Sequence, residues 1–422
     1  MSEEGTESSW SKLPLPLQAQ FFEIARTRSE VIKKDFESYL QRKKALCELL
    51  DLTKIFSSVH PNEEWRKWRI GVVDGSRSPQ ISQRIGGRFG VCAAVGHIWQ
   101  NNKIVDPKED TLFLSMDISD DQIRDRELTD KALELLMTWL ERKVACDCLK
   151  KGLDLLLIDG SFFGYRVGCK YVADEDIPFE GGQTKKASEL IKEINDLTEK
   201  LAKSDTPVLG IVKRVTTSAL DGYVAFERGS EEQCMNRNDR LILSSIMPEG
   251  TVFAYDHLFK PPERHFQYFS LYRGRIRHPP TEETQTREKI LEYAKEHFRK
   301  RDIEKNLGEG MADVVLSLSR FFQRCSNTIP FCFEMRRDLA FDNGNFRDKF
   351  NNITSFFQHP TNNNPATGLP LMIDLIDEEV AIPISFTKEF VQEIHGILSS
   401  QVGIDIHDLM NYFSSLNPQK EE

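Results

Sequence analysis

Two runs of apolar residues in this chain end in the same three residues. The runs cover residues 70–73 and 153–158, and Asp-Gly-Ser follows each of them, at 74–76 and 159–161. An aliphatic run that is bounded by a glycine turn is typical of a strand buried on both faces. Each strand would carry an aspartate, Asp74 or Asp159, to the place where the chain leaves the sheet. The alternative is simple turn chemistry, in which Asp caps the turn and Gly adopts a positive φ.

The residues between these two strands predict an antiparallel meander and then a long helix. Strand patterns cover residues 86–99 and 111–116, and Asn101-Asn102 lies between them as a turn. Over residues 120–151 the apolar positions recur every three or four residues, which indicates an amphipathic helix. Glu141 lies near the C-terminal end of this helix, where the helix dipole disfavours an acidic side chain.

The remaining sequence mixes helix and strand patterns. A pair of amphipathic helices is predicted over residues 15–57, after a polar tip at 1–11. A buried strand at 207–214 ends in two cations, Lys213 and Arg214. Further strands are predicted at 251–255, 266–276 and 331–334, and further helices at 184–204, 238–243, 283–301, 311–325 and 387–416.

Composition narrows the class of protein. The 422 residues carry a net charge of −10, which argues against a generally basic protein that coats DNA. The eight cysteines are scattered without a C-x-x-C pair, so we expect reduced thiols and neither a zinc site nor disulfides. There is no apolar run of about 18 residues and no signal-like N-terminus, so we expect a cytoplasmic protein with no membrane partner.

The acidic residues follow an order that suits a metal-dependent nuclease. Asp74 follows the first strand, Glu141 lies on the helix, Asp159 ends the next buried strand, and Asp374 and Asp377 come late in the chain. Hard divalent cations prefer oxygen ligands, and two ions about 4 Å apart can activate a water against a phosphodiester. Clustered carboxylates repel one another, so such a site would be unfavourable without the ions.

This arrangement predicts an α/β fold, with a ribonuclease H-like mixed sheet flanked by helices and with helical N-terminal and C-terminal additions. We divide the chain into an N-terminal tip and helices at 1–67, a nuclease domain at 68–400 and a C-terminal end at 401–422. Ser76 and Ser161 are interpreted as turn caps, and His97, His257 and His265 lack the spacing of metal ligands.

In the same order, several segments of the chain resemble the NurA family of DNA nucleases. They are residues 72–76, 140–145, 156–161, 209–214 and 369–377. The resemblance implies a ribonuclease H-like fold related to the Piwi nuclease domain and a preference for Mn²⁺, with Mg²⁺ as the alternative. It also implies 5′ to 3′ degradation of DNA ends and cleavage of single strands. The implied assembly is a homodimer that works with the hexameric ATPase HerA in DNA-end resection or phage defence.

The resemblance also implies roles for individual residues. Asp74, Glu141 and Asp159 would be metal ligands, and Asp377 would be the fourth ligand, where many relatives have His. Lys213 would contact a phosphate or the transition state. Leu369 stands where the family tends to have Tyr, so no role of that tyrosine carries over.

Alternatives remain open for most of these positions. Glu134 competes with Glu141, Asp374 competes with Asp377, and Lys213 could be an exposed cation at the end of a strand. Arg273, Arg275 and Arg277 alternate along a predicted strand and could bind the DNA backbone together with Arg214, or they could protect a sheet edge.

Two other functions compete with the nuclease. One is a catalytically inactive subunit with the nuclease fold that binds and regulates an ATPase. The other is a ribonuclease H-like enzyme directed by RNA, although the sequence contains no separate RNA-binding module.

Overall fold

The computed structural model describes most of the chain. The described residues are 13–101, 103–105, 111–120, 126–179, 183–229, 231–261, 263–272, 281, 285–401 and 405–415. Within them, no helix combines the length and the apolar character that crossing a membrane requires.

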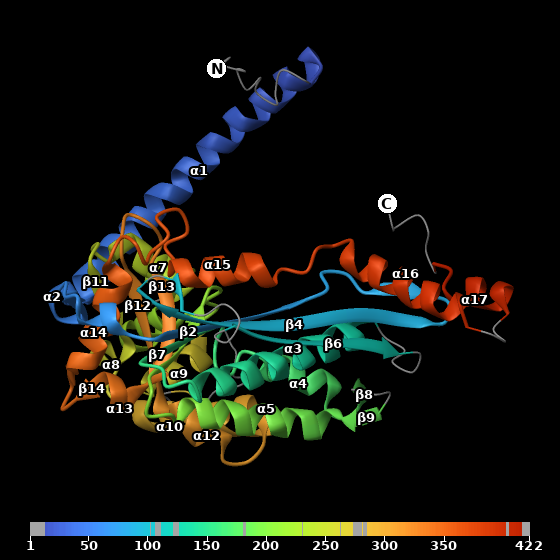
Figure 1. The fold of residues 1–422 in the computed structure, drawn as a ribbon. Coiled ribbons are helices and arrows are strands. Elements are labelled where there is room, and N and C mark those ends of the chain that lie inside the picture. The colour runs from blue at the N-terminus through green and yellow to red at the C-terminus, as the bar shows by residue number, and fades with distance from the viewer. Residues whose placement is uncertain are drawn as a thin grey trace, which may run out of the picture.

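A mixed sheet of eleven strands organises the fold (Figure 1). The central strands β2 (Ile70–Arg77), β7 (Leu155–Asp159) and β10 (Val208–Val212) are parallel neighbours, and the other pairings are antiparallel. The sheet order is β1-β11-β12-β13-β10-β7-β2-β4-β3, and β5 and β6 also pair with β4. The remaining strands of this sheet are β1 (Phe56–Ser58), β3 (Ser82–Arg84), β4 (Gly87–Gln100), β5 (Lys103–Ile104), β6 (Thr111–Asp120), β11 (Thr251–Ala254), β12 (Leu318–Arg324) and β13 (Phe331–Arg336).

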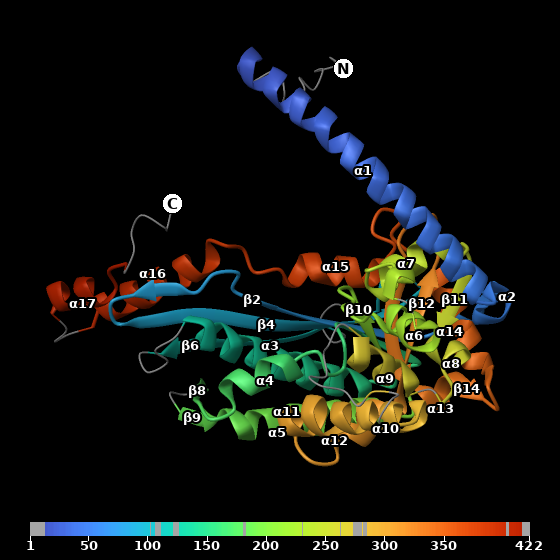
Figure 2. The same ribbon diagram turned by 180° about the vertical axis from the view of Figure 1, so that it is seen from behind.

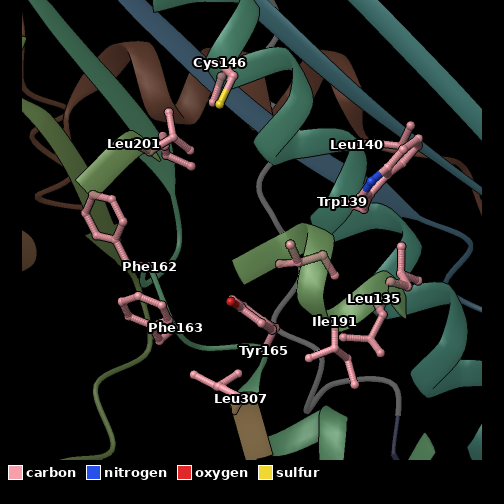
Figure 3. Packing of buried hydrophobic residues seen from close by; sticks show 14 of the residues in the cluster. Leu135, Trp139, Leu140, Cys146, Phe162, Phe163, Tyr165, Ile191, Leu201 and Leu307 are labelled. Atoms are coloured by element: carbon pink, nitrogen blue, oxygen red, sulfur yellow. The ribbon is translucent and has the colours of Figure 1, made fainter. Parts of the chain in front are cut away.

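Helices cover both faces of the central strands (Figures 1 and 2). On one face lie α3 (Arg126–Leu149) and α5 (Ala187–Ala202), and their apolar side chains fill the first core. Figure 3 shows part of this packing, with Leu135 and Trp139 of α3 near Ile191 of α5. On the opposite face, α14 (Asp348–Gln358) and α15 (Leu371–Val380) pack on a second core that is rich in phenylalanine. The predicted α/β class with a mixed sheet flanked by helices is therefore confirmed.

The two ends of the chain add helices to this sheet. The N-terminal region forms one helix of 35 residues, α1 (Leu15–Leu49), which projects from the body in Figures 1 and 2 and contacts it through Leu46. The predicted pair of helices was wrong, because no turn residue interrupts this segment and only the short α2 (Leu52–Ile55) follows. At the C-terminal end, two helices replace the single predicted one: α16 (Phe386–Ser399) and α17 (Ile406–Tyr412).

Two further predictions were wrong where the tertiary structure overrides the local pattern. The segment predicted as a strand at 266–276 begins as helix α9 (Arg264–Leu271), and residues 273–280 lie outside the described part. The helix predicted at 311–325 ends at Ser317, because residues 318–324 form β12 between β11 and β13. Pairing on both sides satisfies the backbone of β12 better than an isolated helical turn would.

Shorter elements connect these layers. The helices are α4 (Arg166–Val172), α6 (Ala219–Arg228), α7 (Asp239–Ile246), α8 (Tyr255–Leu258), α10 (Arg287–His297), α11 (Lys305–Leu307), α12 (Met311–Ser317) and α13 (Arg337–Ala340), with η2 (Glu64–Lys67), η4 (Glu231–Gln233) and η6 (Phe298–Glu304). Two small hairpins pair β8 (Asp176–Phe179) with β9 (Gln183–Lys186) and β14 (Phe341–Asp342) with β15 (Asn345–Phe346).

The close approach of β10 to the turn after β7 yields a stability prediction. A Cβ at Gly210 would lie 2.7 Å from the carbonyl oxygen of Gly160, so Gly210→Ala must move the backbone. We expect a loss of about 1–3 kcal/mol in the free energy of unfolding, measured by urea denaturation. The matched control is Gly396→Ala in α16, where a Cβ meets nothing within 4 Å. This control should gain about 0.5–1 kcal/mol, and equal effects of the two substitutions would contradict the prediction.

Candidate metal centre

The central strands place three of the predicted site residues on one face of the sheet. Side chains alternate between the two faces along a strand, so Asp74, Asp159 and Lys213 lie on the same face as the apolar residues two positions before them. Those residues are Val72, Leu157 and Ile211, and all three belong to the core under α14 and α15. Val73 pairs with Ile158 in the parallel register of β2 and β7, which sets Asp74 beside Asp159.

The sequence pattern predicted that Asp74 ends its strand, and this prediction was wrong. β2 continues to Arg77 because β4 pairs with it through Arg77 and Cys92. Asp74 therefore lies within the sheet and is only 3% exposed, while Asp159 is the last residue of β7.

Helix α15 brings a third carboxylate over these strands. It packs against β2, β4 and β7. Asp74, Asp159 and Asp377 each offer one carboxylate oxygen, and these oxygens lie within 4.8 Å of one another. We call these three residues the acidic group. Asp374, the alternative on the same helix, lies apart from it, because its Oδ2 accepts hydrogen bonds from Asn364 at 2.6 Å and Thr367 at 2.7 Å.

A lysine occupies the centre of the acidic group. Lys213 Nζ lies 3.1 Å from Asp159 Oδ2 and 2.8 Å from Asp377 Oδ2. Burial acts to lower the pKa of Lys213, yet the adjacent Asp159, Asp377 and Asp74 raise it on balance. The lysine thus provides positive charge where the carboxylates converge.

Glu141 approaches from the opposite face of the sheet. It belongs to α3, which packs closely under β2: a Cβ at Gly75 would lie 3.1 Å from Met137 Cγ, a tight contact, and 3.5 Å from the Cβ of Glu141. The Glu141 side chain is buried, and its Oε2 lies 3.4 Å from Nη1 of the buried Arg142. Glu134 instead accepts a hydrogen bond from Lys131 at 2.8 Å, in a partly exposed pair on the same helix.

Burial and mutual repulsion change the acidity of these groups. Burial, with the charges of Asp159 and Glu141, raises the pKa of Asp74 to about 9. Burial likewise raises the pKa of Glu141 to about 7, against the opposing effect of Arg142. The pKa of Asp159 is also raised, chiefly by burial. Desolvation and like charges are the two effects that a bound cation would relieve.

Two buried oxygen atoms of the acidic group fit a metal ion. Asp74 Oδ1 accepts a hydrogen bond from the backbone N–H of Gly75 at 2.7 Å. Asp74 Oδ2 and Asp159 Oδ1 are buried and receive no hydrogen bond from an N–H or hydroxyl group among the described residues, and without a metal ion a proton on Asp74 can bridge the two carboxylates. Buried acceptors without partners are rare and call for an explanation, and a divalent cation that binds carboxylate oxygen provides one.

A buried ion pair supports the turn that follows Asp159. Ser161 Oγ donates a hydrogen bond to Glu334 Oε2 at 2.7 Å, and the backbone N–H of Phe162 donates to the same oxygen at 3.2 Å. Arg320 Nε donates to Glu334 Oε1 at 3.1 Å. The sequence interpretation missed Glu334 and Arg320, although a glutamate within an apolar strand was an available signal.

A second polar contact holds α15 against β4. His97, which is 3% exposed, lies with its Nε2 2.6 Å from Glu379 Oε2 and its Nδ1 3.0 Å from Thr111 Oγ1. Glu379 is two residues after Asp377, so this contact helps to place the carboxylate. His97 is not part of the acidic group.

The proposed DNA-contacting arginines are not brought together by the described structure. Arg214 is exposed beside Lys213. Arg273, Arg275 and Arg277 lie outside the described residues.

Comparison with known proteins identifies relatives of this architecture. The sequence matches the NurA domain family over residues 69–382. The fold is similar to the NurA nuclease from Sulfolobus solfataricus, with a TM-score of 0.53 at 12% identity, covering 93% of this chain and 99% of that one. A crystal structure of NurA bound to dAMP and manganese aligns with a TM-score of 0.45 at 12% identity, over 90% of this chain and 98% of that one. No curated protein matches the sequence.

The raised pKa of Asp74 predicts how stability depends on pH without metal. The folded protein retains a proton on Asp74 that the unfolded chain releases above pH ~4. This contribution is fully present below the unfolded pKa and is lost as the pH rises toward the folded pKa of about 9. Thermal unfolding in EDTA should therefore show a smaller fall in Tm from about pH 5 to about pH 9 for Asp74→Asn than for wild type. Asp374→Asn should behave as wild type, and parallel curves for Asp74→Asn and wild type would contradict the assignment.

The position of Lys213 predicts competition between this lysine and a metal ion. Lys213→Met leaves Asp159 and Asp377 without their counter-ion, so Tm in EDTA should fall. Mn²⁺ should restore stability and bind several-fold more tightly than to wild type, as measured by isothermal titration calorimetry. Arg214→Met, which removes the neighbouring exposed cation, is the control. The prediction fails if both variants melt alike and bind Mn²⁺ as wild type does.

Proposed function

The chain belongs to the NurA family, and on this premise we propose that it is a metal-dependent DNA nuclease. The observation that carries the proposal is the convergence of Asp74, Asp159 and Asp377, with two buried carboxylate oxygens that receive no hydrogen bond from an N–H or hydroxyl group in the described structure. A set of oxygen donors alone suits a hard divalent cation, Mn²⁺ or Mg²⁺.

We assign the metal ligands to Asp74, Asp159 and Asp377, and we propose Glu141 of α3, which lies outside this group, as a further ligand. When bound, two divalent ions would supply an activated water and stabilise the charge on the leaving oxygen of a phosphodiester. Without a metal ion, burial raises the pKa of Glu141 to about 7, so Glu141 would have to release this proton before its carboxylate could bind a cation. Arg142 lies behind Glu141 and orients its carboxylate.

Lys213 is assigned to the substrate phosphate. Its Nζ lies at the centre of the acidic group, within reach of any phosphate oxygen that this group binds. Since the ammonium group stays charged near neutral pH, it can neutralise negative charge that develops on the phosphate. Arg214, with Arg273 and Arg275, is assigned to the DNA backbone on the basis of the sequence alone.

The substrate and partner assignments follow from the family. We propose that the enzyme degrades DNA from 5′ ends, cuts single strands, and acts as a homodimer with a HerA-like hexameric ATPase in DNA-end processing or phage defence. The net charge of −10 supports this partnership, because an acidic protein attracts DNA weakly on its own and benefits from a translocase that delivers the strand.

Cleavage of labelled linear duplex and single-stranded DNA tests the proposal. Wild type should cut with Mn²⁺ or Mg²⁺ and not in EDTA, assayed with and without the ATPase. Asp74→Asn, Asp159→Asn, Glu141→Gln and Asp377→Asn should each reduce the rate about a hundredfold or more, because each removes a charged oxygen ligand.

Two matched variants control for position on the same helices. Glu134→Gln on α3 and Asp374→Asn on α15 remove the alternative carboxylates and should leave cleavage within about threefold of wild type. Loss of activity in these variants but not in Glu141→Gln and Asp377→Asn would reverse the ligand assignment. Absence of metal-dependent cleavage with and without the ATPase would favour an inactive regulatory subunit.

A further inference from the structure

A cavity lies on the face of the sheet that carries the acidic group. It has a volume of about 250 Å³ and is lined by Trp65, Trp68 and Trp99, which come from two separate segments of the chain. The chain has five tryptophans, so most of them gather here. We call this the tryptophan cavity.

The three tryptophans line the cavity in two ways: one ring is buried and held by its neighbours, and two rings remain partly exposed. Trp65 is buried, its Nε1–H donates to the carbonyl of Asn62 at 2.9 Å, and its ring packs edge-on to Phe356 and His359. Trp68 and Trp99 are half-buried, so part of each ring stays accessible. The Nε1–H of Trp99 is buried and has no acceptor in the described part of the chain.

A cation stands at the edge of this cavity. Trp65 and Trp68 flank Arg66 and Lys67 in η2. The Arg66 guanidinium lies 5.7 Å from the centre of the Trp65 ring, forms an exposed ion pair with Glu63 Oε1 at 2.6 Å, and lines the cavity. Lys67 is exposed and does not line it. Aromatic rings interleaved with cations are the combination that binds single-stranded nucleic acid.

The tryptophan cavity and the acidic group share two elements. Ile70 of β2 lines the cavity, and Asp74 lies four residues further, about 13 Å along the strand. Met372 of α15 lines the cavity too, and Asp377 lies five residues further, about 7–8 Å along the helix. A DNA strand whose phosphate lies at the acidic group can therefore reach the tryptophan cavity with a nearby base.

We propose that the tryptophan cavity stacks an unpaired base of the DNA strand that is being cleaved. The proposal rests on the nuclease function proposed above and adds a site for the base to it. Stacking on indole tolerates any base, since every base has an aromatic face, and Arg66 can contact the adjoining phosphate. Stacking also does not depend on positive charge, which suits a chain with a net charge of −10.

Binding of a short fluorescein-labelled oligothymidylate in EDTA tests this site without cleavage. The oligonucleotide should quench the tryptophan fluorescence of wild type, and fluorescence anisotropy gives Kd. Trp68→Ala should lose part of the quenching and bind about tenfold more weakly, whereas Trp68→Phe, which keeps an aromatic face, should retain most of the affinity. Arg66→Gln should weaken binding more than Lys67→Gln, its matched control on the same turn.

A blunt duplex, which offers no unpaired base, should bind Trp68→Ala and wild type alike. The proposal is overturned if Trp68→Ala, with unchanged Tm, binds the single strand as wild type does, or if it weakens duplex binding equally. The proposal is also overturned if an ATPase partner quenches the tryptophan fluorescence and DNA does not. Normal metal-dependent cleavage with binding that does not depend on Trp68 would refute this site alone. Binding that depends on Trp68, without any cleavage, would refute the nuclease proposal alone.

Discussion

The main physical constraint on this structure is the repulsion among buried carboxylates, which the surrounding fold must overcome. Asp74, Asp159 and Glu141 are withdrawn from water and influence one another's ionisation, so each resists ionisation in the folded protein. Such a cluster persists only when the surrounding fold holds it in place. Burial of the apolar strands holds the carboxylates in place, since moving Asp74 or Asp159 away would also expose the aliphatic residues that precede them in β2 and β7.

Two positive groups, Lys213 and Arg142, offset the repulsion, and a third, Arg320, offsets the charge of the neighbouring Glu334. Lys213 lies within the acidic group, Arg142 lies beside Glu141 under the sheet, and Arg320 neutralises Glu334 behind the turn that follows Asp159. Only Lys213 touches the acidic oxygens themselves. It is therefore the group that a bound cation would oppose directly, whereas the two arginines pair with Glu141 and Glu334.

Helix α15 connects the separate parts of the site. Its apolar residues Met372, Ile373 and Ile376 pack on the second core, while Asp377 and Glu379 reach Lys213 and His97. The same helix lines the tryptophan cavity at its N-terminal end. The proposed metal ligand Asp377 and the proposed base site therefore share one helix, and a change in the position of α15 would alter both.

The local sequence pattern was sufficient to predict the strands and the helix that carry the candidate site. The two aliphatic runs predicted β2 and β7 with their aspartates, the apolar period predicted α3 with Glu141, and the run at 207–214 predicted β10 with Lys213. These elements are long or strongly apolar, so burial dictates their conformation whatever the rest of the chain does.

Which of these residues come into contact depends on how the strands and helices pack together. Pairing between neighbouring strands made residues 318–324 a strand and extended β2 beyond Asp74. The packing of α15 across β2 selected Asp377, and not Asp374, for the acidic group. Glu334 reaches Ser161, and Trp99 meets Trp65, across long separations in the sequence. A sequence pattern describes the environment of one segment, whereas these contacts depend on the relative positions of several.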